Sequence, residues 1–389
     1  MGSGSSGPTA RDLGEVRLLN RMQGLDIGAG GGNSRILDMQ YTNIAAYTGV
    51  RVMYRNYSSS QAMTVQGAVV AGAANPTVDG NTLTWSNVLF SGASSIVVPL
   101  GSGAGSDFIP GFVISDEVSL NSVARNDGGS KVILRVRTAY SDNSNICSVP
   151  STSWNSTNIA TGYQFIRELS TNPLANIKTY SGTPFDAGGS LSPDAVFFRM
   201  AQPYYSQESY GDSLTQSTGS VDTSAGWPQQ TQFLAATDAA RITTANYAVI
   251  GQTHTATYDT LTARLAAGTL PTIMTMFGHS INSGSNQAAF DASWVRVQAA
   301  YASCVSAGVT FGACYNPPSS GVSDTLIQQQ NTRLSTLPLA IKFDFYTALQ
   351  LGGVLNPLYD NGDGVHINPA GQLVMAGVVK TAYQGAGIW

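Results

Sequence analysis

Residues 290–314 read FDASWVRVQAAYASCVSAGVTFGAC, and this stretch predicts a helix followed by a strand. Apolar residues in its first part recur at intervals of three and four, the spacing of one helix face: Phe290, Trp294, Val297 and Tyr301. Gly308 stands where a glycine commonly ends a helix, and the apolar run 309–314 has the length of a buried strand.

Strands and helices alternate in the same way on both sides of this stretch. Before it, we expect strands at 246–250 and 271–277, and between them apolar residues repeat at helical spacing, namely Tyr258, Leu261 and Leu265. After it, a helical pattern at 326–334 precedes another apolar run at 339–346. Such alternation predicts a parallel sheet with helices on both faces.

The last helix is predicted from its start signals. Asn368 can cap a helix with its side chain, Pro369 suits the first helical position, and the pattern reaches Tyr383. Functional sites of parallel sheets lie at the carboxyl ends of the strands, so the loops that follow the strands are where we expect the chemistry.

The earlier part of the chain has a different pattern of apolar residues. Short apolar runs separated by Gly, Asn, Asp and Ser predict strands at 50–54, 63–70, 82–90, 95–100, 111–120 and 131–138. In the last run, apolar Val132, Leu134 and Val136 alternate with Ile133, Arg135 and Arg137, so we expect one buried sheet face. These runs predict an antiparallel sandwich or jelly roll, an all-β unit that precedes the α/β sheet.

The length of 389 residues exceeds what one core usually reaches, so we expect two domains. Residues 1–7, MGSGSSG, have the composition of an expression-tag remnant. We assign 8–195 to the sandwich with its linker, which includes the Ser-, Asn- and Thr-rich stretch 141–161, and 196–389 to the α/β catalytic domain.

Composition limits the partners. Only 11% of the residues are charged and the net charge is -4, which argues against nucleic acid and anionic lipid as ligands. No apolar run approaches the roughly 20 residues of a membrane span. Few charges and 42 glycines favour a secreted or periplasmic protein whose signal peptide has been removed.

We expect Cys304 and Cys314 to be buried thiols rather than a bridge, and no metal-ligand spacing appears.

Two short motifs carry the chemistry. The first is Gly211-Asp212-Ser213-Leu214, and the second, near the end of the chain, contains Asp363 and His366 three residues apart. A serine hydroxyl becomes a nucleophile when an imidazole takes its proton and a carboxylate orients that ring. Groups three residues apart can meet within one turn, and Gly364 between them lets the backbone bend sharply.

The two motifs together resemble the GDSL, or SGNH, hydrolases. The resemblance implies a flavodoxin-like catalytic domain, no cofactor or metal, and a triad of Ser213, Asp363 and His366. It also implies an oxyanion hole formed by the backbone N–H of Ser213, the N–H of Gly251, and an asparagine side chain from a third sequence block.

This chain departs from the family pattern in the third block. Ser280 stands where the family has its asparagine, and Asn282 follows two residues later. We expect Asn282 to complete the oxyanion hole. The alternative is that Ser280, through its hydroxyl or a bound water, donates to the oxyanion while Asn282 closes a surface turn.

A second departure precedes the serine. Residues 204–210, YYSQESY, are polar where the family has an apolar buried strand, so we expect the first strand to be short or unusually polar. The apolar residues 196–198 form a candidate strand that lies too far upstream to lead directly into the serine turn. The earlier half also resembles, more weakly, the sandwich that some secreted members of the family carry.

The resemblance implies hydrolysis of short-chain acyl esters, above all acetyl esters, on substrates that include carbohydrates. Lysophospholipase or thioesterase activity is an alternative, as is a non-catalytic glycan-binding protein on a hydrolase fold. A glycosidase based on Asp344 and Asp360 has no motif behind it. We expect His254 and His279 to lie at the rim of the pocket, as surface or hydrogen-bonded histidines.

Overall fold

The structure is a computed structural model, and it describes residues 11–16, 25–27, 35–56, 58–75, 82–129, 132–141, 146–148, 163–169, 177–178, 195–218 and 226–389. Residues 1–7 and most of the stretch 141–161 therefore lie outside the described residues. The predicted domain boundary between 195 and 196 stays a prediction.

Five parallel strands form the sheet that the alternation predicted. In spatial order they are β14 (Ile242–Asn246), the second half of β13 (Ala195–Tyr210), β15 (Ile273–Phe277), β16 (Thr310–Cys314) and β17 (Ile341–Phe343). Numbered along the chain, this is the order 2-1-3-4-5 of flavodoxin-like sheets. The prediction of an α/β sheet is confirmed.

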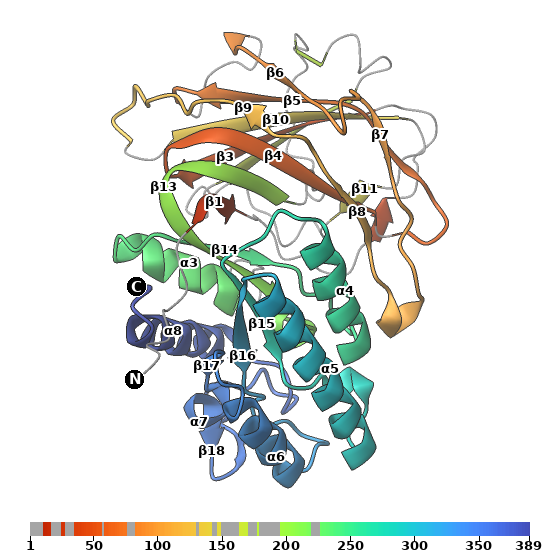
Figure 1. Ribbon diagram of the computed structural model, residues 1–389, viewed down its shortest axis with the longest axis vertical. Coiled ribbons are helices and arrows are strands. Elements are labelled where there is room, and N and C mark those ends of the chain that lie inside the picture. Colours follow the sequence, from red (N-terminus) through yellow and green to blue (C-terminus); the bar gives the residue numbers. More distant parts are fainter. Residues whose placement is uncertain are drawn as a thin grey trace.

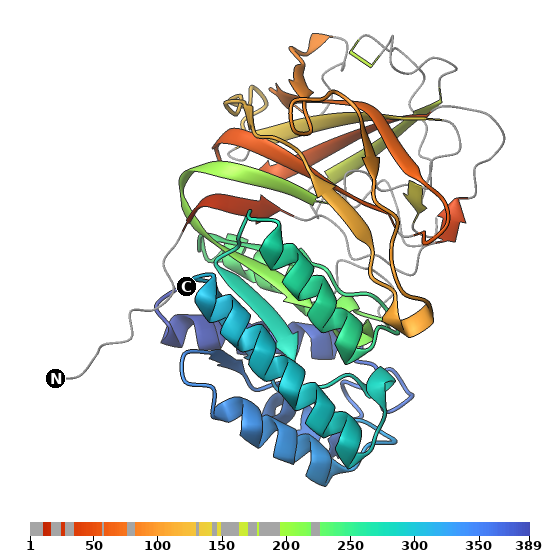
Figure 2. The same ribbon diagram turned by 45° about the vertical axis from the view of Figure 1, so that its right-hand side comes forward.

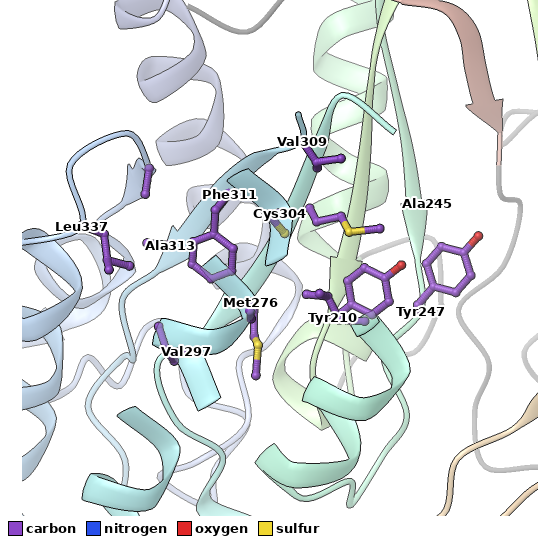
Figure 3. Packing of buried hydrophobic residues seen from close by; sticks show 14 of the residues in the cluster. Tyr210, Ala245, Tyr247, Met276, Val297, Cys304, Val309, Phe311, Ala313 and Leu337 are labelled. Atoms are coloured by element: carbon purple, nitrogen blue, oxygen red, sulfur yellow. The ribbon is translucent and has the colours of Figure 1, made fainter. Parts of the chain in front are cut away.

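Helices cover both faces of the parallel sheet (Figures 1 and 2). On one face lie α4 (His254–Ala266), α5 (Gln287–Ser306) and α6 (Asp324–Ser335), and their apolar residues share a cluster with β13 and β16. Figure 3 shows this cluster, in which Val297 and Cys304 of α5 approach Phe311 of β16. The other face holds α3 (Trp227–Thr237) and α8 (Pro369–Gly385).

The signals for helix ends are confirmed. The side chain of Asn368 caps α8 by accepting a hydrogen bond from the backbone N–H of Gly371, and proline occupies the first turn. Gly308 follows α5 with a φ of +66°. The thiols of Cys304 and Cys314 are free and buried, as expected.

The antiparallel part contains two packed sheets. One has the order β12 (Tyr163–Leu169), β3 (Arg35–Ile44), β10 (Val132–Tyr140), β5 (Met63–Ala73) and β6 (Ser86–Val88), with β7 (Ile96–Val98) also on β5. In the other, the first half of β13 pairs with β1 (Arg11–Val16) and β4 (Tyr47–Asn56), and β4 pairs with β8 (Gly111–Ile114) and β9 (Val118–Ser119). A hydrophobic cluster lies between these sheets.

The remaining elements are short. They are β2 (Leu25–Ile27), the 3-10 helix η2 (Gly105–Asp107), β11 (Ile146–Ser148), α2 (Ser213–Gln216), the 3-10 helix η6 (Ile281–Ser283), α7 (Phe345–Leu349), β18 (Gln350–Leu351) and β19 (Val354–Leu355). No helix within the described ranges is both long and apolar enough to cross a bilayer.

Strand β13 belongs to both parts of the molecule. It is unusually polar at 204–210, which was one of the two alternatives expected, but it is not short, and the expectation that 196–198 lie too far upstream is wrong. A single strand of 16 residues runs from the apolar residues 196–198 directly to the serine turn (Figure 1). Its first half is antiparallel to β4, and its second half is parallel to β14 and β15. Because β13 belongs both to the parallel sheet and to one antiparallel sheet, a separate sandwich domain preceding the catalytic part is not confirmed.

Two other sequence expectations are wrong. Strand β10 is buried on both faces, since Arg135 and Arg137 are nearly as inaccessible as Leu134. Leu134 packs into the hydrophobic cluster between the two antiparallel sheets, and on the opposite face the guanidinium of Arg137 lies over the ring of Trp85. The strand expected at 246–250 ends at Asn246. The backbone N–H groups of Tyr247 and Val249 instead bond to the chain around the serine turn.

Candidate active site

Ser213 lies at the carboxyl end of β13, as the first residue of the short helix α2. The preceding Asp212 forms the N-cap, and its Oδ1 accepts a hydrogen bond from the N–H of Leu214 at 3.0 Å. The N–H groups of Thr215 and Gln216 bond to the carbonyl oxygen of Asp212, which leaves the N–H of Ser213 as the unpaired donor of this turn. The turn therefore places the hydroxyl of Ser213 next to its own backbone donor.

His366 and Asp363 lie in the loop before α8, and the structure brings them to Ser213. The Nε2 atom of His366 is 3.0 Å from the Oγ of Ser213, and its Nδ1 is 2.6 Å from the Oδ2 of Asp363. A carboxylate only accepts hydrogen bonds, so Nδ1 carries the proton of the neutral ring and Nε2 accepts from the serine hydroxyl. This is the tautomer that general-base catalysis requires.

The backbone of this loop is built around Asp363. Its Oδ1 accepts hydrogen bonds from the backbone N–H groups of Val365 and His366 at 2.9 and 2.8 Å. Gly364 has a φ of +71°, and a Cβ there would lie 2.8 Å from the Cβ of Ser320. A glycine is therefore required at this position for both conformation and space.

The two carboxylates beside Ser213 lie in opposite environments. Burial alone would raise the pKa of Asp363, but hydrogen bonds from the ring and backbone of His366 outweigh it and lower that pKa to about 2. Burial raises the pKa of Asp212, against the lowering effect of its hydrogen bond from Ser280. Asp363 is thus ionised at neutral pH and can stabilise a protonated imidazole.

Two backbone donors predicted for the oxyanion hole are free to act. Gly251 lies in the loop between β14 and α4, with a φ of +73°. Within the described part of the chain, the N–H groups of Ser213 and Gly251 donate to no protein acceptor. Free N–H groups near a nucleophile are what an oxyanion hole needs. Their role stays a prediction.

The third block is held in an internal hydrogen-bond network. The hydroxyl of Ser280 lies 2.6 Å from the Oδ2 of Asp212 and 3.0 Å from the carbonyl oxygen of Gln252. The Nδ2 of Asn282 donates to the same carbonyl oxygen and to the Oγ of Ser280, both at 3.2 Å. Both candidates for the third oxyanion donor are thus bonded to protein atoms, and the choice between them stays a prediction.

His254 and His279 do not lie at a pocket rim, because their residues are only 2% and 3% exposed. The Nε2 of His254 donates to the carbonyl oxygen of Phe277, and the Nε2 of His279 donates to that of Gly284. Burial lowers the pKa of His254 to about 3 and that of His279 to about 4, so both rings are neutral. They are hydrogen-bonded structural histidines, and no metal-binding cluster of acidic, His or Cys side chains occurs among the described residues.

Sequence reasoning missed Gln252 as part of the site. Its carbonyl oxygen joins the third block, and its side-chain Nε2 donates to the carbonyl oxygen of Phe108, in the antiparallel part, at 3.2 Å. No motif marks this glutamine; only its place after Gly251 could have drawn attention to it. The acidic residue of the first motif, Asp212, was recognised as part of a pattern but not as the cap of α2 and the partner of Ser280.

Comparison with known proteins gives structural matches only. No family model matches the sequence, and no curated protein matches it. A GDSL-like lipase from Bacteroides thetaiotaomicron is 17% identical over 48% of this chain and 93% of its own, with a TM-score of 0.37. The chain is similar in structure to GDSL lipases and esterases.

Two further solved structures are similar to a comparable extent. A psychrotrophic esterase from Pseudoalteromonas sp. is 15% identical over 46% of this chain and 97% of its own, with a TM-score of 0.37. A catalytic mutant of an acetylxylan esterase from Geobacillus stearothermophilus is 14% identical over 48% of this chain and 95% of its own, with a TM-score of 0.36.

Proposed function

We propose that this chain is a serine ester hydrolase that acts through an acyl-enzyme intermediate. The observation that carries the proposal is the continuous contact from the Oγ of Ser213 through the ring of His366 to Asp363, at 3.0 and 2.6 Å. Few other reactions need a hydroxyl, an imidazole and a carboxylate in this order.

In the first half of the reaction, the Oγ of Ser213 attacks the ester carbonyl while the Nε2 of His366 takes the hydroxyl proton. Asp363 stabilises the imidazolium that forms. The backbone N–H groups of Ser213 and Gly251, with the amide of Asn282, stabilise the oxyanion of the tetrahedral intermediate. The imidazolium then protonates the leaving alcohol, and the acyl group remains on Ser213.

In the second half, a water molecule attacks the acyl-enzyme. His366 takes a proton from this water and returns it to the Oγ of Ser213 as the acid is released. Short acyl esters, above all acetyl groups on a carbohydrate, are the proposed substrates. One structural neighbour is named as an acetylxylan esterase, and acetylated xylan is therefore a first substrate to test.

The proposal is tested by measuring turnover of p-nitrophenyl acetate and of acetylated xylan by the wild type and by Ser213→Ala. We expect the substitution to lower kcat by about four to six orders of magnitude, because it removes the nucleophile. Circular dichroism would check that the variant folds. Turnover that survives in a folded Ser213→Ala variant would exclude this mechanism.

A further inference from the structure

The connection between β7 and β8 reaches from the antiparallel part to the α/β part. It extends to the end of α4 that follows the Gly251 loop (Figures 1 and 2). At its tip lies η2, and three hydrogen bonds join this tip to the other part. The backbone N–H of Thr253 donates to the carbonyl oxygen of Ser106 at 2.8 Å, the hydroxyl of Thr253 donates to the carboxylate of Asp107, and Gln252 donates to Phe108.

The shape of the tip is fixed by close backbone approaches. Ser102 and Ile109 pair across the hairpin through two backbone hydrogen bonds of 2.9 and 2.8 Å. A Cβ on Gly101 would lie 2.1 Å from the ring of Phe108, so this ring packs directly on the glycine backbone. A tip that is braced in this way presents Asp107 in a defined place.

The residues that the tip holds are those that follow Gly251. Before Gly251, the loop is fixed to the serine turn through the N–H groups of Tyr247 and Val249. After it, the two residues 252–253 are fixed by the β7–β8 tip and by the third block. The direction of the Gly251 N–H is therefore set jointly by two anchors, one of which comes from the antiparallel part.

Charge adds to the anchoring by Asp107. Thr253 is the N-cap of α4, and a carboxylate near a helix N-terminus interacts favourably with the helix dipole. A hydrogen bond from a hydroxyl to a carboxylate is also stronger than one between neutral groups. Of the three hydrogen bonds that join the tip to residues 252–253, the exposed one to Asp107 is thus the one with a carboxylate as acceptor.

We propose that Asp107 is a positioning residue of the active site: by holding Thr253, it directs the backbone N–H of Gly251 toward the developing oxyanion. The proposal rests on the proposed ester hydrolase activity and extends it. Through this contact the antiparallel part contributes to catalysis.

The test compares Asp107→Ala with Asp107→Asn, which keeps an oxygen that can accept from Thr253. A donor that acts on the transition state affects kcat more than KM, so Asp107→Ala should lower kcat about ten-fold with KM nearly unchanged. Asp107→Asn should restore most of the loss. A double variant with Thr253→Val should be no slower than Thr253→Val alone, because both changes remove the same bond.

The matched control is Asp116→Ala. Asp116 also lies in the antiparallel part, and its carboxylate accepts from the N–H groups of Ser91 and Gly92, far in sequence from the Gly251 loop. We expect the control to keep the wild-type kcat while its melting temperature falls. The proposal is overturned if folded Asp107→Ala keeps the wild-type kcat, or if Asp116→Ala loses as much. Absence of any turnover dependent on Ser213 in the wild type would instead refute the proposed function, and this proposal with it.

Discussion

The loop that carries Asp363 and His366 lies at the surface, whereas the polar side chains in the second half of β13 lie in the interior. In the loop, the side chains of Asp363 and His366 are 48% and 25% exposed. In β13, the carboxylate of Glu208 is fully buried and lies 2.6 Å from the guanidinium of Arg264. The hydroxyl of Tyr210 also donates to Glu208, and that of Tyr383 donates to Gln207.

The difference in exposure separates residues that are suited to chemistry from residues that stabilise the fold. The exposed pair can meet a substrate, whereas the side chains of Arg264 and Glu208 are only 2% and 0% exposed. Burying a charge costs several kcal/mol unless a partner neutralises it. The interior group therefore stabilises the fold, and the surface loop carries the residues of the proposed reaction. Each of the following variants should affect either catalysis or stability and leave the other nearly unchanged.

The largest expected effect is on catalysis. We expect His366→Ala to lower kcat by about 10⁴-fold or more with little change in stability, because it removes the general base from an exposed loop. In the wild type, kcat/KM should rise with pH, since the base must be neutral to accept a proton.

The same pH profile identifies the base. His254, His279 and Asp363 have pKa values of about 3, about 4 and about 2, so none of them accounts for a rise in kcat/KM between pH 5 and 9. Steady-state kinetics over these pH values would measure the profile. A variant of His366 that retained the pH dependence would assign the base to another group.

The next effect is on stability. Glu208→Gln keeps the size of the side chain but leaves Arg264 without the carboxylate that neutralises it, so the free energy of unfolding should fall by about 3–5 kcal/mol. Urea denaturation would measure the loss. The matched control is Glu117→Gln, which breaks the partly exposed ion pair with Arg199 and should cost less than about 1 kcal/mol. Equal losses in the two variants would show that burial does not distinguish the pairs.

The third expected effect concerns the third sequence block, whose residues bear on both catalysis and stability. If Asn282 supplies the third oxyanion donor, Asn282→Ala should lower kcat by about two to three orders of magnitude with KM nearly unchanged. Ser280→Ala should act on stability instead, costing about 1–3 kcal/mol, because it removes the hydroxyl that bonds the buried Asp212. A large kcat loss for Ser280→Ala beside a near-normal Asn282→Ala would reverse these roles.

The sequence predicted the surface loop far better than the interior. Asp363 and His366 lie close together in the chain, so their contact needs only a turn, and Gly364 marks that turn. The helices of the α/β part could be predicted because each has a repeating apolar face and recognisable end residues. Local sequence patterns were sufficient to predict both the turn and the helices.

The interior of β13 could not be predicted because its partners are distant in sequence. Nothing near Glu208 indicates that Arg264 will neutralise it, and a polar run such as 206–209 resembles a solvated strand. Strand β10 was misjudged for the same reason, since the covering of its second face depends on other parts of the chain. The third block was hard to predict for the same reason, because Ser280 bonds to Asp212, which belongs to a distant motif.

The sharing of β13 between the two sheets also affects the order in which the chain can be assembled on the ribosome. Strand β4 is made early, but its partner in the sheet, the first half of β13, emerges only after about half of the chain has been synthesised. Until then β4 has an open edge, and open strand edges favour association with other chains. We expect the nascent protein to be most dependent on chaperones during this interval, before the first half of β13 has left the ribosome and can pair with β4.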